Sequence, residues 1–409
     1  MIWSHLITIS LIFSWMVSPD ALVLLGNSAG KGGLPFIAAL AIGAALSVLC
    51  AKLIYHPDAT GNTSDKTAPH TFTIGQYAAT TLTVATRISL VVLLPTGMLV
   101  TAGFTFNETF VYWFPNFGFS FILLGLILTL HLTGERFAEA AQLLFTGIVI
   151  FCLLLLSLAG LFGTTPEQVY GATSHFNLPL PLICGALLLY LGYDQPSPDS
   201  NAKWYILLAI IGGFVLFSLW TVASLRHVAP EKLASSTVPY IISATKILGT
   251  PGKALIGIAI IAGGCSVTNG LFILANKALL QQTDLFPSFI NHFWKRRIYP
   301  IVFSVAIGLS MILGLAGDEL LETYIRGALL LWIAATAFRC LIATRRIQLT
   351  KSCSFHYGYL ISALFLLAAL YLTVTDNYTT RLFSFFVLTL VVSAIVTAGG
   401  YIFHRPPPP

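Results

Sequence analysis

The chain has 409 residues, of which 56% are hydrophobic and only 9% are charged, so most of it must lie in hydrocarbon and not around one soluble core. The formal net charge of +6 comes from basic residues at the ends of apolar runs, which membrane topology explains better than nucleic-acid binding does. No P-loop or dinucleotide-binding motif is present, and the six cysteines have neither CxxC nor Cys/His spacing. We therefore expect no cofactor, no metal site and no enzymatic activity.

Hydropathy indicates about twelve apolar runs long enough to cross a bilayer as helices. In chain order they are residues 3–26, 33–55, 75–104, 117–133, 138–163, 178–194, 203–226, 252–280, 299–316, 320–344, 355–375 and 381–403. Transmembrane barrel strands are much shorter than these runs. The predicted fold class is thus an all-α integral membrane protein with about twelve transmembrane helices.

Basic residues predict the orientation of these spans. They concentrate on one side of the predicted membrane, above all in WKRRIY (294–299) and ATRRIQLTK (343–351). Because cytoplasmic loops carry an excess of Lys and Arg, we expect a multi-pass protein of the cell membrane with both termini in the cytoplasm. The closing residues 405–409 read as a short disordered tail. The lipid bilayer is the one certain partner, and the oligomeric state stays open.

Two spans contain helix-breaking residues. The first span reads ISLIFSWMVSPDALVLLG, with Ser18, Pro19 and Asp20 inside it, and the sixth ends in LYLGYDQPSPDSN. Proline cannot donate a backbone hydrogen bond, so the first span is either simply kinked or truly broken. The carboxyl group of Asp20 favours a broken helix at a binding site, because ionisable groups inside spans usually face a cavity. Interrupted helices five spans apart are typical of inverted-repeat transporters.

Residues 204–290 resemble amino acid permeases of the amino acid/polyamine/organocation superfamily. VAPEKLASSTVPYIISATKILG resembles the external loop of that family, in which a V-P-x-E-x-L element precedes a re-entrant helix ending in L-G. CSVTNGLFILANKALLQQTDLFPSFI resembles its eighth helix and the cytoplasmic ending, with Asp284, Leu285 and Pro287 retained and Asn276 or Lys277 in place of an arginine.

The resemblance implies a leucine-transporter-like fold with a five-plus-five inverted repeat. The two halves would be residues 1–163 and 178–345, followed by two peripheral helices in 354–404. In the family, a glycine-rich element of the first span and an aromatic-rich element of the sixth span hold the substrate. The corresponding positions here are Ser18, Pro19, Asp20, Tyr190, Gly192, Tyr193 and Asp194. Pro19 contributes no amide, and Asp20 would repel a carboxylate, so the chain departs from the family here.

Other polar residues inside spans complete the candidate site. Arg87, near the centre of the third span, must be paired or hydrated, and we expect Asp20 or Asp194 as its partner, in either a fixed or a switchable ion pair. Ser266, Thr268 and Asn269 of the eighth span either line the site or bond to their own helix backbone. Asp194 is alternatively a solvated helix end. We place His131 and Arg136 at the membrane interface.

These observations predict a secondary active transporter that moves a small amino acid or amine by alternating access. The fifth span lacks the lysine of some proton-coupled relatives, so the coupling ion stays open. Proton coupling through Asp20 and Asp194 is preferred over sodium, because Asp20 offers a carboxyl group that can titrate. A cationic substrate and a zwitterion both remain open. The alternative is a transporter-like membrane subunit that does not transport and acts as a sensor, receptor or assembly partner.

Overall fold

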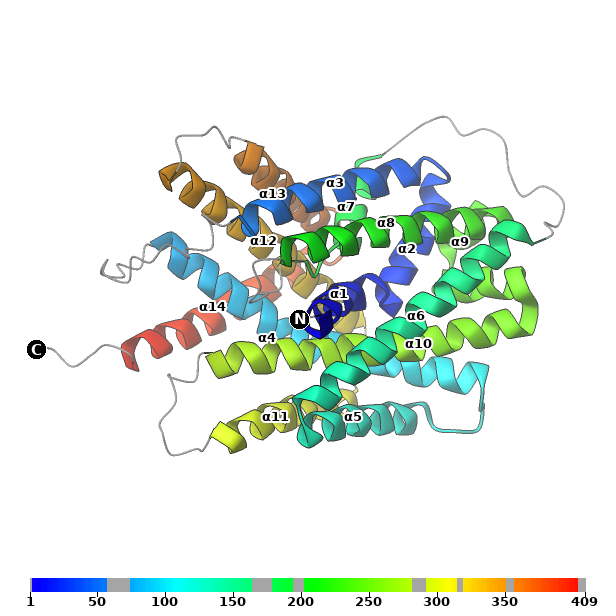
Figure 1. The fold of residues 1–409 in the computed structure, drawn as a ribbon, viewed down its shortest axis with the longest axis horizontal. Helices are drawn as coiled ribbons and strands as arrows, with labels where there is room; N and C mark the ends of the chain where they lie inside the picture. The colour runs from blue at the N-terminus through cyan, green and yellow to red at the C-terminus, as the bar shows by residue number, and fades with distance from the viewer. Residues whose placement is uncertain are drawn as a thin grey trace, which may run out of the picture. The chain divides into compact units, whose positions relative to one another are not determined.

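The computed structural model describes residues 2–56, 74–163, 179–193, 202–281, 292–314, 319–350 and 357–403, and the described residues contain helices but no strands (Figure 1). The chain divides into two compact units, which are treated separately below. The first unit comprises Met1–Val48 and Met98–Gly270, and the second comprises Leu49–Gly97 and Leu271–Pro409. This division follows contacts and leaves the predicted inverted-repeat halves untested, so these halves remain a prediction.

Helices of the first unit begin with a broken pair and end in a kinked helix. They are α1 Ile2–Met16, α2 Pro19–Gly32, most of α3 Phe36–Ile54, the end of α4 Ile74–Thr109, α5 Asn116–Thr133, α6 Glu135–Phe162, α7 Leu180–Leu189, α8 Ala202–His227, α9 Pro230–Ser235 and most of α10 Pro239–Gln281. Gly249 divides α10, since its φ of 65° lies in the left-handed region that favours glycine. The helix before Gly249 occupies the place of the expected re-entrant helix ending in L-G.

The second unit contains the start of α4, the ends of α3 and α10, and four further helices. These four are α11 His292–Ile312, α12 Glu319–Thr350, α13 Tyr357–Val374 and α14 Thr379–Phe403. Both α13 and α14 pack on α12. Where α14 crosses α12, a methyl group at Gly327 would lie 2.6 Å from the Phe385 ring, so the glycine permits close approach.

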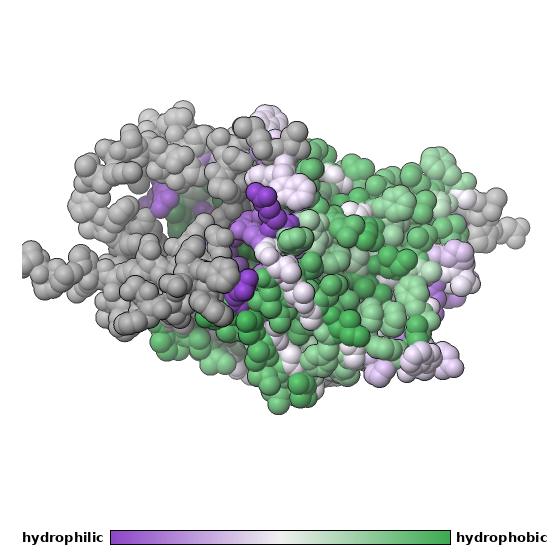
Figure 2. Space-filling model, turned by 60° about the horizontal axis from the view of Figure 1, so that its bottom comes forward, coloured by the Kyte–Doolittle hydropathy of each residue, from purple (hydrophilic) through white to green (hydrophobic). Residues whose placement is uncertain are grey.

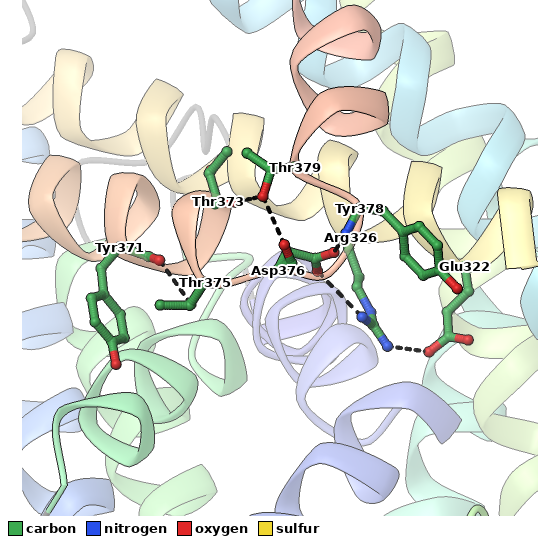
Figure 3. Close-up of polar contacts among 8 residues, drawn as sticks. All are labelled: Glu322, Arg326, Tyr371, Thr373, Thr375, Asp376, Tyr378 and Thr379. Atoms are coloured by element: carbon green, nitrogen blue, oxygen red, sulfur yellow. Dashed lines mark hydrogen bonds and ion pairs between the residues drawn. The ribbon is translucent and has the colours of Figure 1, made fainter.

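Arg326 of α12 holds the turn between α13 and α14 (Figure 3). Its guanidinium pairs with Glu322 one helical turn earlier and with Asp376 in the turn, where the N–O distance is 3.3 Å. Asp376 also accepts the Tyr378 amide at 2.8 Å, and its carbonyl accepts the Thr379 hydroxyl at 2.7 Å. These bonds turn the chain directly before α14 and attach the turn to α12.

The helices have the length and surface expected of membrane spans. Eight helices of the described residues are long and apolar enough to cross a bilayer, or up to nine if α1 and α2 form one broken span. Three shorter apolar helices cover Leu180–Leu189, Arg297–Ile312 and Thr379–Ile395. The eight long helices, the broken pair and the three shorter helices correspond in position along the chain to the twelve predicted runs. Apolar side chains cover much of the visible described surface (Figure 2), and large ones such as Phe151 are 65% exposed. The chain is a multi-pass membrane protein.

Candidate functional site

The first span is broken between Met16 and Pro19, as the sequence predicts. The axes of α1 and α2 differ by 53° across this break. Ser18 is the N-cap of α2, and its hydroxyl accepts the Ala21 amide at 3.1 Å. Pro19 stands at the first helical position, where its missing N–H costs nothing and its fixed φ suits the helix. The break is therefore a new helix start and not a kink in a continuous helix.

The backbone of the break lies directly against α10. A methyl group at Gly263 would be 3.0 Å from the Val17 carbonyl oxygen and 3.5 Å from Cδ of Pro19. A methyl group there would be in unusually tight contact with the backbone of the break, so glycine suits this approach. α10 therefore reaches the backbone of the first span at the point where its helical hydrogen bonding is interrupted.

Asp20 lies in the first turn of α2, where the helix dipole favours a negative charge. It is half-buried, in contrast to Ser18 and Pro19, which are buried. Tyr240, ahead of the membrane-crossing part of α10, lies within the electrostatic range of this carboxylate. Burial first, and the charges of Asp20 and Glu108 next, raise the pKa of the Tyr240 phenol above its usual range. The phenol therefore stays protonated and can donate to an anionic neighbour.

The end of α7 is tied to the end of α1. The Trp15 indole, one residue before the end of α1, donates to the Leu188 carbonyl across 2.8 Å. Tyr190 caps α7 and packs its ring at 5.8 Å from that of Phe217 in α8. Two residues later, Gly192 has a φ of 101°. The two helices expected to be interrupted therefore end beside one another, as a shared binding site requires.

Both tyrosines of the aromatic-rich element are buried, Tyr190 fully and Tyr193 to within 1%. Asp194 and the residues up to 201 lie outside the described part of the chain, so the prediction for Asp194 is untested. Arg87 is a half-buried residue of α4 within the second unit. Its predicted pairing with Asp20 would join the two units and stays a prediction.

Below the break, buried polar side chains join α1, α6 and α10. The Thr146 hydroxyl of α6 lies 3.0 Å from the Ser10 hydroxyl of α1 and 2.8 Å from the Ser266 hydroxyl of α10. The Gln142 amide nitrogen lies 3.0 Å from the same Ser266 oxygen. All four side chains are at most 4% exposed. Hydrogen bonds between spans stabilise helix association in a membrane, so these residues hold α1 in place.

Asn269 extends this hydrogen-bonded group to α5. Its amide nitrogen donates to the Gln142 side-chain oxygen and to the Ala138 carbonyl, each at 2.9 Å. His131, which we expected at the membrane interface, contacts the Asn269 oxygen through Nε2 at 3.1 Å. We call Ser10, His131, Gln142, Thr146, Ser266 and Asn269 the polar network. Thr268 is outside it, because its hydroxyl bonds the Gly264 carbonyl of its own helix at 2.8 Å.

Sequence reasoning missed four members of this network. Ser266 and Asn269 were candidates, whereas Ser10, His131, Gln142 and Thr146 were not. A signal was present in the fifth span, where Gln142 and Thr146 are four residues apart in an apolar run and so share one helix face. The face that α6 turns toward α10 could not be read from the sequence.

No protein-family model matches the sequence, and no curated protein matches it. Solved structures do match over nearly the whole chain. A crystal structure of the Eremococcus coleocola manganese transporter carrying an alanine mutation has a TM-score of 0.60 at 12% identity, covering 98% of this chain and 94% of that one. The same transporter in complex with an aromatic bis-isothiourea substituted compound gives 0.58 at 13% identity, with the same coverage. The chain has the fold of a membrane transporter.

At this level of identity the likeness concerns the fold alone. The predicted transporter architecture is thus supported at the level of helices and their packing. The resemblance to the amino acid/polyamine/organocation superfamily is not confirmed, and the five-plus-five arrangement remains a prediction. Within this transporter fold, the break at Ser18 and the end of α7 are the described features that fit a binding site.

Proposed function

We propose that the protein is a secondary active transporter that binds its substrate beside the break between α1 and α2 and works by alternating access. The observation that carries this proposal is the bond between Trp15 and the Leu188 carbonyl, which brings the ends of two short helices together in the first unit. Helix ends expose unbonded main-chain groups that can bind a polar solute within the membrane. We propose transport without any catalytic activity.

The substrate we propose is a small amino acid or amine, with a proton as the coupling ion. Asp20 supplies a half-buried carboxylate at the break, which attracts a cationic group. Pro19 removes one of the amides that would bind a carboxylate. An amine, or a zwitterion bound mainly through its ammonium group, therefore fits the described residues better than an anion. Protonation of Asp20 would release such a cation and so couple it to the proton gradient.

A divalent metal ion is the second candidate substrate. The solved structures that share this fold are of a manganese transporter. Carboxylate and carbonyl oxygens, such as those of Asp20 and Val17, are the ligands that manganese prefers. Against it, the described residues contain no group of three or more His, Cys, Asp or Glu side chains placed to hold a metal. The amine therefore remains our first choice.

Uptake into proteoliposomes tests the proposal directly. Purified protein is reconstituted and offered labelled amino acids, amines and Mn²⁺, with and without a pH gradient. We expect accumulation of an amine or amino acid that depends on the gradient. Asp20→Asn should lose most of it, whereas Glu231→Gln, which changes an exposed carboxylate in the first turn of α9, should keep it.

Other outcomes separate the alternatives. Gradient-dependent uptake of Mn²⁺ alone would replace the amine with a metal ion. Uptake that needs sodium and ignores the pH gradient would remove only the proton assignment. If no compound accumulates and none changes thermal stability, the protein does not transport these substrates, and the non-transporting subunit becomes the better interpretation.

A further inference from the structure

A main-chain carbonyl fixes the direction of the amide hydrogen bonds in the polar network, and the hydroxyl hydrogen bonds can follow the same direction. The Ala138 carbonyl can only accept, so the side-chain atom of Asn269 that faces it must be the NH₂ nitrogen. The same nitrogen contacts Gln142, which must present its oxygen there and its own nitrogen to Ser266. Neither amide can be rotated without placing like atoms against each other.

This order determines the proton on His131. The Asn269 oxygen faces the imidazole Nε2 at 3.1 Å, and an oxygen without hydrogen accepts only from an N–H. Nε2 therefore carries hydrogen in the network as the structure shows it. The remaining ring nitrogen, Nδ1, is then the atom that gains or loses a proton as the imidazole titrates. Both protonation states of His131 preserve the bond to Asn269.

At the opposite end, the network terminates on α1. The Ser10 hydroxyl can donate to the Gln142 main-chain carbonyl at 3.1 Å, and the Thr146 hydroxyl then donates to the Ser10 hydroxyl, with the Ser10 carbonyl as a second acceptor at 3.5 Å. The Ser266 hydroxyl then donates to Thr146. Every amide and hydroxyl hydrogen in this chain of bonds is directed from His131 toward α1 or to a carbonyl. A charge on His131 would polarise the bonds in this same direction.

Charged groups near His131 come from α6. Glu135 and Arg136 occupy its first turn, and Glu139 follows one turn later. Glu139 also accepts the Trp3 indole of α1 at 3.3 Å. On α10 the facing group is the neutral Asn269. The contact between α4 and α5 is made by the Ser120 hydroxyl to the Leu99 carbonyl and brings no ionisable group.

We propose that His131 is a proton-binding site of this protein, which takes up a proton at Nδ1 and transmits the charge to α1 through Asn269, Gln142, Ser266, Thr146 and Ser10. The imidazolium donates a stronger hydrogen bond than the neutral ring does, so protonation strengthens the attachment of α1 to α6 and α10. Loss of the proton weakens it. A group that binds protons more tightly in one conformation shifts the population toward that conformation.

Coupling of this proton to solute movement rests on the transport proposed above, whereas proton binding itself does not. Ser266 and Asn269 then act as links between His131 and α1. Ser266 and Asn269 are then not at the break, where we propose that Asp20 contacts the substrate. The protein would thus have a second titrating position besides Asp20.

Nitrogen-15 NMR of histidine-labelled full-length protein in nanodiscs tests proton binding without any substrate. Chemical shifts of ring nitrogens report which nitrogen carries hydrogen, and His131→Gln identifies the signals. We expect a protonated Nε2 at every pH and an Nδ1 signal that changes as the pH is lowered. An unprotonated Nε2, or an Nδ1 signal that does not change, would overturn the assignment.

Amide hydrogen exchange of α1 tests transmission of the charge. Glutamine can still donate to Asn269 but does not titrate. The amides of α1 should therefore exchange in His131→Gln as they do in the wild type, and the only pH dependence left should be that of the chemical exchange step. His131→Ala removes the donor and should exchange about 2- to 10-fold faster, the effect of one net hydrogen bond. His56→Gln, in the second unit, is the matched control, and it should change neither the exchange rate of α1 nor the pH dependence of that rate. Unchanged exchange in both His131 variants would refute transmission.

The two proposals fail in distinguishable ways. Proteoliposomes that accumulate no substrate, together with a titrating Nδ1 signal, would refute transport and leave the proton site standing. Gradient-driven uptake that persists in His131→Gln with an unchanged pH profile would refute a role of this proton in coupling. The transport site at Asp20 would then be unaffected.

Discussion

The Trp15 indole donates to the Leu188 carbonyl across 2.8 Å, and this bond joins the last turn of α1 to the last turn of α7. Trp15 is 3% exposed, so its indole cannot exchange the bond for one to water. The sequence places these residues more than 170 positions apart, yet both precede an interruption of their helices. The Trp15 side chain of the first interrupted helix therefore holds the ends of the two interrupted helices together.

Trp15→Phe should destabilise the protein. Phenylalanine keeps most of the ring but cannot donate, and the half-buried Leu188 carbonyl would lose its partner at a cost of about 1 to 3 kcal/mol. Thermal unfolding in detergent measures the change. Trp204→Phe is the control, because Trp204 is 72% exposed and should change stability by less than about 0.5 kcal/mol. Equal effects of the two substitutions would contradict a specific role of the Trp15 bond.

Thr146→Val should weaken the polar network. Valine has nearly the shape of threonine, but both the Ser10 and the Ser266 hydroxyl would lose a partner at a buried position. We expect a loss of about 1 to 3 kcal/mol in the free energy of unfolding. Thr268→Val removes a hydroxyl that bonds only its own helix, and should cost less than about 1 kcal/mol. A larger loss for Thr268→Val would show that the network is not the stabilising element.

Gly263→Ala should separate α10 from the break. The added methyl group would stand 3.0 Å from the Val17 carbonyl oxygen, which belongs to backbone and cannot rotate away. Overpacking of this kind costs about 1 to 3 kcal/mol, and we expect proteoliposome uptake to fall with it. Gly125→Ala in α5 meets nothing within 4 Å and should raise helix stability by up to about 1 kcal/mol. Full uptake in Gly263→Ala would argue against a site at the break.

The turn around Asp376 should be more sensitive to substitution than the ion pair beside it. Asp376→Ala removes the acceptor of the Tyr378 amide together with the Arg326 contact, and we expect a loss of about 1 kcal/mol. Glu322→Ala breaks a pair in which both side chains are about half exposed or more, so the loss should stay below about 0.5 kcal/mol. High salt should reduce the effect of Glu322→Ala further. A larger loss of stability in Glu322→Ala than in Asp376→Ala would contradict this role of Asp376 in the turn.

The sequence predicted the helices well because each depends on local properties. A run of apolar residues of sufficient length specifies a span, and Ser18 followed by Pro19 specifies where the first span must stop and restart. Gly249 likewise ends the short helix at the start of α10, since few other residues adopt its conformation. These features require no knowledge of which helices are neighbours.

The candidate site was predicted only in part, because contacts between helices depend on which faces meet. Gln142 and Thr146 were visible as polar residues in an apolar span, but only the packing of α6 against α10 places them beside Ser266. His131 lies near the end of α5, which suggested the interface, whereas its ring turns inward to Asn269. Asp194 and the Arg87 pairing remain predictions.

α2 and α9 pack closely against each other (Figure 1). A methyl group at Gly30 would be 2.3 Å from the Ala234 amide nitrogen, and one at Gly26 would be 2.6 Å from Pro239. The Asn27 amide, oriented to donate, bonds the Leu233 carbonyl. α2 is therefore packed against α9 and the start of α10, and two residues of chain join α2 to α1. An antibody fragment that immobilises α9 would act as a handle on α2, and through it on the first span, without entering the substrate path.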